Sequence, residues 1–112
     1  MNMIDLETAQ RIIAEHLVKM ERDMNDFGSA LPGHKDKPYL HLVVTKTTEY
    51  EFGWVFAYNT REYIETNNIS HALAGNAPLI VDKADGQIYV TGTAPPFEQY
   101  IEQYRKGIKH RA

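Results

Sequence analysis

The chain has 112 residues, the length of one domain, and its 43% hydrophobic and 24% charged residues are ordinary globular values. It contains no cysteine, which excludes disulfides and thiolate chemistry. The net charge of −3 argues against broad nucleic-acid binding, which needs a basic face. No apolar run approaches the roughly 18 residues of a membrane span, and the acidic start is not a signal peptide. We therefore expect one cytoplasmic domain over residues 1–112.

The first element is predicted to be a helix capped by Asp5. Its apolar residues recur at three- and four-residue steps, at Leu6, Ala9, Ile13, Leu17, Met20 and Met24. Residues 26–38 contain two glycines and two prolines, so we predict a loop there, including a turn at Pro32-Gly33. Such a long connection is often functional.

Two strands are predicted next, over residues 39–46 and 50–58, with a turn at 47–49. Alternation places five aromatic residues of the second strand on one face: Tyr50, Phe52, Trp54, Phe56 and Tyr58. We interpret this face as core beneath a helix. The alternative is a partly exposed recognition face, which a small-ligand binding module would use.

The second half predicts a hairpin followed by a helix. Residues 61–65 form either a short strand or a helical turn, and residues 70–73 form one helical turn ended by Gly75-Asn76. Strands at 79–81 and 87–91 flank an Asp-Gly turn over residues 82–86. The last helix is capped by Thr93 and has an apolar face of Phe97, Tyr100, Ile101 and Tyr104.

The C-terminal residues are basic. Residues 105–112 hold four basic residues and no acid, which leaves −7 for the rest of the chain. We interpret this basic tail as the end of the last helix, where cations favour the helix dipole, fraying into water. Together the elements predict an α+β fold: a helix, a four-stranded mostly antiparallel sheet and a closing helix. Both helices would pack on one face and leave the other for a partner.

No residue pattern for catalysis or for a metal or cofactor is found. The five histidines lack zinc spacing, and Ser70-His71 alone makes no triad. Asp82 and Asp85 lack the ligand pattern of a calcium loop. We therefore predict a protein that is not an enzyme, with no catalytic residues, no metal and no cofactor.

The order of several short motifs resembles the bacterial immunity protein 35 family over residues 52–104. The motifs are Gly53-Trp54, the segment 63–66, the Ala-Gly-Asn-Ala-Pro turn at 74–78, Asp-Lys-x-x-Gly at 82–86 and Gly-Thr-Ala-Pro-Pro at 92–96. That family also includes a small enterobacterial protein described as heat-stable and chaperone-like. We interpret the motif residues as structural, setting turns and filling the core: Gly53, Trp54, Gly75, Asn76, Pro78, Asp82, Gly86, Gly92 and Pro95.

The resemblance implies an immunity protein that neutralises a cognate toxin through a stoichiometric complex. The segment 49–66 carries net −3, which suits a basic toxin cleft, so its acids are the candidate toxin contacts: Glu49, Glu51, Glu62 and Glu65. The rival hypothesis is a general heat-stable, chaperone-like stress protein without a dedicated toxin. The sequence leaves open the toxin's identity, the surface that binds it and the oligomeric state.

Overall fold

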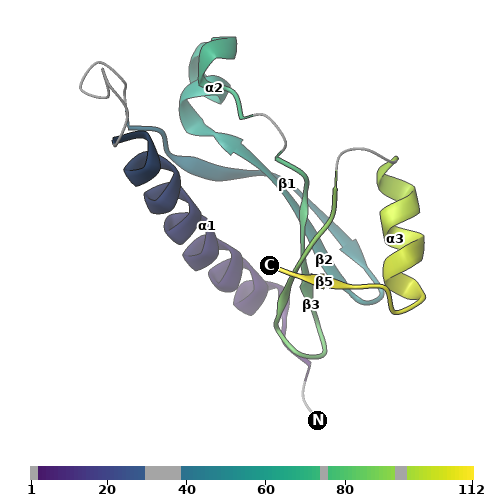
Figure 1. Cartoon of the computed structure of the whole chain (residues 1–112). Helices are drawn as coiled ribbons and strands as arrows, with labels where there is room; N and C mark the ends of the chain where they lie inside the picture. Colours follow the sequence, from purple (N-terminus) through teal and green to yellow (C-terminus); the bar gives the residue numbers. More distant parts are fainter. Residues whose placement is uncertain (1–2, 30–38, 74–75, 93–95) are drawn as a thin grey trace.

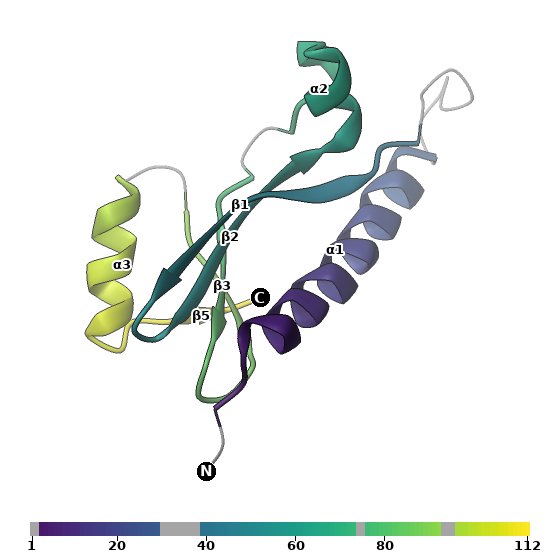
Figure 2. The same cartoon turned by 180° about the vertical axis from the view of Figure 1, so that it is seen from behind.

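The computed structural model describes residues 3–29, 39–73, 76–92 and 96–112 and confirms the α+β class (Figures 1 and 2). One antiparallel sheet has the strand order β1-β2-β3-β4-β5. The elements in chain order are α1 (Leu6–Ser29), β1 (Leu42–Tyr50), β2 (Gly53–Thr60), α2 (Arg61–Thr66), the 3₁₀ turn η2 (Ile69–His71), β3 (Leu79–Asp82), β4 (Ile88–Val90), α3 (Phe97–Arg105) and β5 (His110–Arg111).

Helix α1 begins as predicted but ends later. The Asp5 carboxylate accepts a hydrogen bond of 2.8 Å from the Thr8 N–H, and the apolar stripe is buried at Ala9, Ile13 and Leu17. The helix continues to Ser29, so the loop predicted from residue 26 does not include residues 26–29. A glycine in a last turn costs a helix only about 1 kcal/mol, which is why Gly28 does not stop it. The rest of that predicted loop, 30–38, lies outside the described residues.

The β1–β2 turn lies at Glu51-Phe52 rather than at 47–49, because β1 extends to Tyr50 and pairs there with Gly53. This displacement makes the prediction of one five-aromatic face wrong. Period-two alternation holds within one strand, but a turn interrupts it. Trp54 and the two aromatics after it in β2 pack toward α1, whereas Tyr50 and Phe52 pack on the opposite face.

The prediction that both helices cover one face is also wrong, since each face of the sheet carries one helix (Figures 1 and 2). Trp54 and Val81 belong to the core beneath α1. Their neighbours Val55 and Ile80 belong to a second core with Ile101 of α3. Strands that are apolar on both faces need cover on both sides, and this requirement places α3 opposite α1.

The basic tail is also not frayed. After α3 the chain turns at Gly107, whose φ is +89°, and His110–Arg111 pairs with β4 as a fifth strand. The Lys109 ammonium lies 4.7 Å from the ring centre of Tyr104 and 5.8 Å from that of Tyr89. Sheet pairing and cation–π contacts therefore hold a segment that composition alone assigned to solvent. With this added strand, the sheet has five strands instead of the predicted four.

The remaining predicted elements agree closely with the structure. Residues 61–65, for which either a short strand or a helical turn was predicted, belong to helix α2. The residue after the helix, Asn67, has a left-handed backbone conformation. The following helical turn is η2, which begins at Ile69 and ends by Ala72, before the predicted Gly75-Asn76. Strands β3 and β4 form the predicted hairpin. The predicted cap Thr93 lies outside the described residues.

The predicted motif residues lie mainly at turns and strand ends. Trp54 is buried, Asn76 donates from its side chain to the Tyr58 carbonyl at 2.8 Å, and the Pro78 carbonyl accepts from the Thr91 hydroxyl at 2.7 Å. Of the glycines, Gly53 pairs with Asp82 across β2 and β3, Gly86 follows the hairpin turn with φ of +69°, and Gly92 lies against the Tyr100 side chain. Gly75 and Pro95 lie outside the described residues.

Candidate functional site

The four candidate acids lie at opposite ends of the β1–β2 hairpin. Glu49 and Glu51 are at its turn, whereas Glu62 and Glu65 are on α2, which follows the far end of β2 (Figure 1). The structure therefore does not bring the four carboxylates together. It separates them into two pairs that a single small contact surface does not span.

At the hairpin turn, both carboxylates are held by cations of the same chain. The Lys83 ammonium donates to Glu49 at 3.1 Å, and the Arg105 guanidinium donates to Glu51 at 2.5 Å and also binds Glu102. The hydrogen bond from Arg105 holds the pKa of Glu51 below its ordinary value. At this end of the molecule, the acidic side chains are therefore largely paired with basic side chains of the same chain.

On α2, the two acids differ in their surroundings. The Glu62 side chain is 19% exposed and accepts from both the backbone N–H (2.6 Å) and the ring Nδ1 (3.1 Å) of His41. Burial raises the pKa of Glu62, but the bonds from His41 outweigh it and the pKa lies below its ordinary value. Glu65 is 65% exposed, with Arg61 at 3.8 Å. Glu62 therefore fastens α2 to the start of β1, and Glu65 is the acid that faces solvent.

Residues 60–72, which we call the α2 tip, are shaped by polar bonds instead of apolar packing. The Thr60 hydroxyl accepts from the Tyr63 N–H at 3.0 Å and donates to the His71 carbonyl at 2.7 Å. At the end of α2, Asn67 closes the helix with a left-handed φ of 55°. Asn68 then caps η2 by accepting from the Ser70 N–H at 3.0 Å. These caps satisfy the backbone groups that a short helix leaves unpaired.

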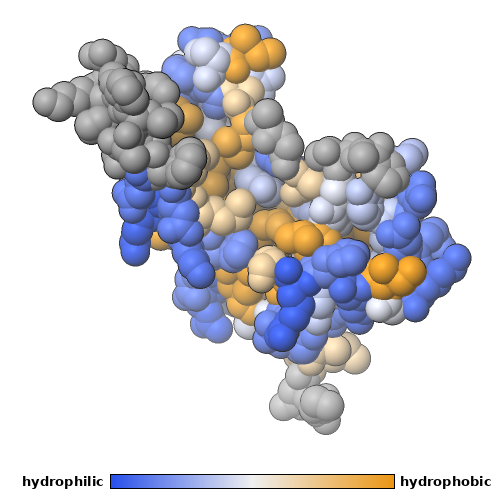
Figure 3. All heavy atoms as spheres, in the orientation of Figure 1, coloured by the Kyte–Doolittle hydropathy of each residue, from blue (hydrophilic) through white to orange (hydrophobic). Residues whose placement is uncertain are grey.

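The α2 tip exposes large apolar side chains. Neither α2 nor η2 contains a buried residue, and Ile64 is 51% and Ile69 82% exposed. Figure 3 shows hydrophobic side chains at this end of the molecule, over α2. Sequence analysis did not single out either isoleucine. The available signal was that both fall in a segment without any apolar periodicity to place them in a core.

A buried polar cluster joins α3 and β5 to the β3–β4 hairpin. The Asp82 carboxylate is buried and accepts from the Tyr104 hydroxyl and, at 2.8 Å, from the Ala84 N–H. The Lys109 ammonium lies 3.7 Å from the same carboxylate. Burial and the bond to Asp82 raise the pKa of Tyr104, so its hydroxyl stays protonated and remains a donor. This geometry fastens one element to another, which is a structural task.

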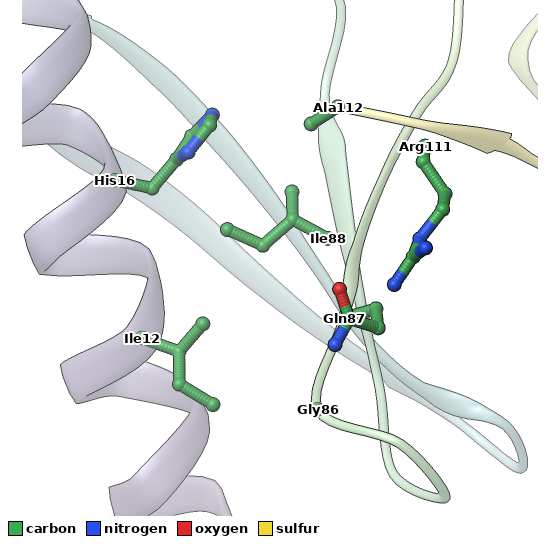
Figure 4. Close-up of a pocket in the computed structure, with 7 residues that line it drawn as sticks. All are labelled: Ile12, His16, Gly86, Gln87, Ile88, Arg111 and Ala112. Atoms are coloured by element: carbon green, nitrogen blue, oxygen red, sulfur yellow. The ribbon is translucent and has the colours of Figure 1, made fainter.

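A pocket of about 220 Å³ lies between α1 and the β4–β5 edge (Figure 4). Ile12 and His16 of α1 face Ile88 of β4, and Arg111 extends toward Gln87. Burial and then the charge of Lys19 lower the pKa of His16 below 6.5, so its ring is neutral at pH 7. The described residues that line the pocket are Ile12, His16, Gly86, Gln87, Ile88, Arg111 and Ala112.

Within the described ranges 3–29, 39–73, 76–92 and 96–112, no three histidines or acids converge in a way that would hold a metal ion. None of the helices described is both long and apolar enough to cross a bilayer.

Comparisons with known proteins match the chain to one family. The sequence model of Immunity protein 35 matches residues 7–107. The chain is also 42% identical over 69 residues to the "Uncharacterized protein YrhB" of Escherichia coli strain K12, covering 62% of this chain and 73% of that protein. No solved structure matches.

Proposed function

Because the chain belongs to the immunity protein 35 family, we propose that it neutralises a cognate bacterial toxin by forming a stoichiometric protein–protein complex. The observation that carries the proposal is the family match over residues 7–107, which includes both helical layers and the first four strands. The complex forms in the cytoplasm of the cell that makes the toxin.

The proposed mechanism is inhibition by occupancy. Binding energy in such complexes is concentrated in a few well-buried apolar and charged anchors, surrounded by contacts that exclude water. The chain offers groups of both kinds on elements whose backbones are fixed by caps and sheet pairing. We therefore propose a non-enzymatic inhibitor that covers the toxin's working surface, with neither chain altered chemically.

The acids Glu49, Glu51, Glu62 and Glu65 are candidate charged contacts in two pairs, of which the toxin uses one. Glu49 and Glu65 are each 65% exposed, and each also lies within 4 Å of a cation of the same chain. Glu62 is already bound to His41, so it supports a contact more readily than it makes one. The separation of the acids into two pairs means that a small toxin domain engages one end of the hairpin.

The proposal predicts that a gene beside this chain's gene encodes the toxin, and that toxin domain is used for the test. Cells that express that domain should stop growing, and co-expression of this chain should restore growth. The purified proteins should form a one-to-one complex by light scattering after size exclusion. Absence of both rescue and complex would overturn the proposal. If the chain instead suppressed heat aggregation of unrelated proteins without binding the toxin, the chaperone-like alternative would replace it.

A further inference from the structure

Within the described residues, the isoleucines of the α2 tip belong to neither hydrophobic core. Ile69, at 82%, is the most exposed large hydrophobic side chain of the described residues, and Ile64 is half exposed on a six-residue helix without a buried residue. β-Branched residues such as isoleucine have a slightly lower helix propensity than unbranched ones, so helix formation does not explain an exposed isoleucine. Burial within the described residues therefore stabilises the fold little through Ile69 and only in part through Ile64. Apolar groups that gather among polar ones on a protein surface mark contacts with another protein.

The α2 tip is also held in a defined shape before any partner binds. Asn59 accepts on one side-chain oxygen from the N–H groups of Thr60 (2.8 Å) and Leu73 (3.1 Å), which closes the two ends of the segment together. The bond from Thr60 to His71 crosses the same gap. A preformed contact surface loses little conformational freedom on association, so more of its burial appears as affinity.

The described residues around the α2 tip carry an excess of negative charge. The side chains of Glu21 and Asn25 on α1 bind the backbone of Leu40 and Leu42, and His41 binds Glu62, so the end of α1 adjoins the tip. Residues 21–26 and 60–72 together hold five carboxylates and two arginines, a net charge of −3. Residues 49–51, 82–85 and 96–112 at the other end hold six carboxylates and five cations, a net charge of −1.

We infer that the α2 tip is the docking surface for the toxin, and that the toxin presents to it a basic surface with an apolar depression for Ile64 and Ile69. The inference rests on the proposed function and assigns it to one end of the hairpin. Charge of opposite sign brings the partners together quickly, and burial of the two isoleucines then slows their separation. Glu49 and Glu51, at the far end, remain outside this contact.

The apolar part of the inference is tested with serine substitutions, which remove apolar surface without adding charge. Ile69→Ser and Ile64→Ser should each raise the Kd for the adjacent-gene toxin domain by about tenfold or more, the usual effect of losing an anchor. The matched control is Ile108→Ser, because Ile108 is exposed to the same 51% as Ile64 but follows α3. Its Kd should change by less than about twofold. Thermal melts verify that all three variants are folded.

The charged part of the inference is tested by reversing the side-chain charge at two equally exposed glutamates, one at each end of the hairpin. Glu65 and Glu49 are both 65% exposed, and each lies within 4 Å of a cation of the chain. Glu65→Lys should slow association by about threefold or more at low salt, and added salt should reduce the difference. Glu49→Lys should leave the association rate nearly unchanged. Rates are measured by surface plasmon resonance with the same toxin domain.

The outcomes separate this inference from the proposed function. If the wild-type chain neither binds the toxin nor rescues cells, both fall. If the wild-type chain binds but only Ile108→Ser and Glu49→Lys weaken the complex, the proposed function stands and the docking end is wrong. If the chain alone is a dimer that Ile69→Ser converts to a monomer, the occupant of the α2 tip is a second copy and the inference is overturned.

Discussion

Replacement of Gly53 by alanine should be far more harmful than the size of a methyl group suggests. Gly53 opens β2 and pairs with Asp82 in the centre of the sheet. A Cβ at this position would overlap the Val81 carbonyl oxygen and lie 3.0 Å from the Asp82 Cα and 3.1 Å from the Lys83 nitrogen. All three are backbone atoms, so no side-chain rotation relieves the contact and β2 must move away from β3.

The expected loss follows from two contributions. Overpacking costs about 1–3 kcal/mol, and a strained backbone conformation adds about 1–3 kcal/mol, here from a φ of +155°. We expect the free energy of unfolding to fall by about 2–6 kcal/mol, out of a total of about 5–15 kcal/mol. At about 4 °C per kcal/mol for a chain of 112 residues, the Tm should fall by about 8–24 °C.

Thermal unfolding followed by circular dichroism measures the change. Gly107→Ala is the matched control, because Gly107 also has a positive φ, of +89°, but has nothing within 4 Å of its Cβ position. Left-handed geometry alone should cost the control about 1–2 kcal/mol. If Gly53→Ala is no more destabilising than Gly107→Ala, then the close approach of β3 does not set the requirement for glycine, and the reasoning is refuted.

Three further predictions concern polar groups. Tyr104→Phe removes a donor from the buried Asp82 carboxylate and should lower the free energy of unfolding in urea by about 1.5–3 kcal/mol; an unchanged urea midpoint would contradict this. Thr60→Val removes the hydroxyl that caps α2 and should cost about 1–2 kcal/mol by thermal melting, whereas an equal Tm would show that the cap is dispensable. Folding lowers the pKa values of Glu62 and Asp85, both through hydrogen bonds that outweigh the opposing effect of burial. Their stabilisation is complete above the unfolded pKa values near 4 and is lost as the pH falls through the lower folded values. The urea midpoint should therefore drop as the pH falls below about 4, and less so in Glu62→Gln; a midpoint independent of pH would refute this assignment.

Local signals in the sequence predicted those features whose cause is local. The Asp5 cap and the apolar stripe located α1, because a helix is defined by bonds between residues three and four positions apart. The Asp-Gly turn located the β3–β4 hairpin for a similar reason. The four acids were predicted to be toxin contacts from the net charge of their segment, which stays a prediction. Their intrachain partners, such as Arg105 for Glu51, come from distant parts of the chain and could not be read from spacing.

The sequence by itself determined that the fold is α+β, that α1 buries Ala9, Ile13 and Leu17 of its apolar stripe, and where the β3–β4 hairpin lies. The tertiary structure decided which face of the sheet each helix covers, that the basic tail joins the sheet, and that the acids separate into two ends. The reason is that periodicity specifies the two faces of a strand, but not what packs against each of them. Strands β2 and β3 are apolar on both faces, and only the assembled sheet shows that α1 covers one face, that α3 covers the other and that the isoleucines of the α2 tip remain exposed.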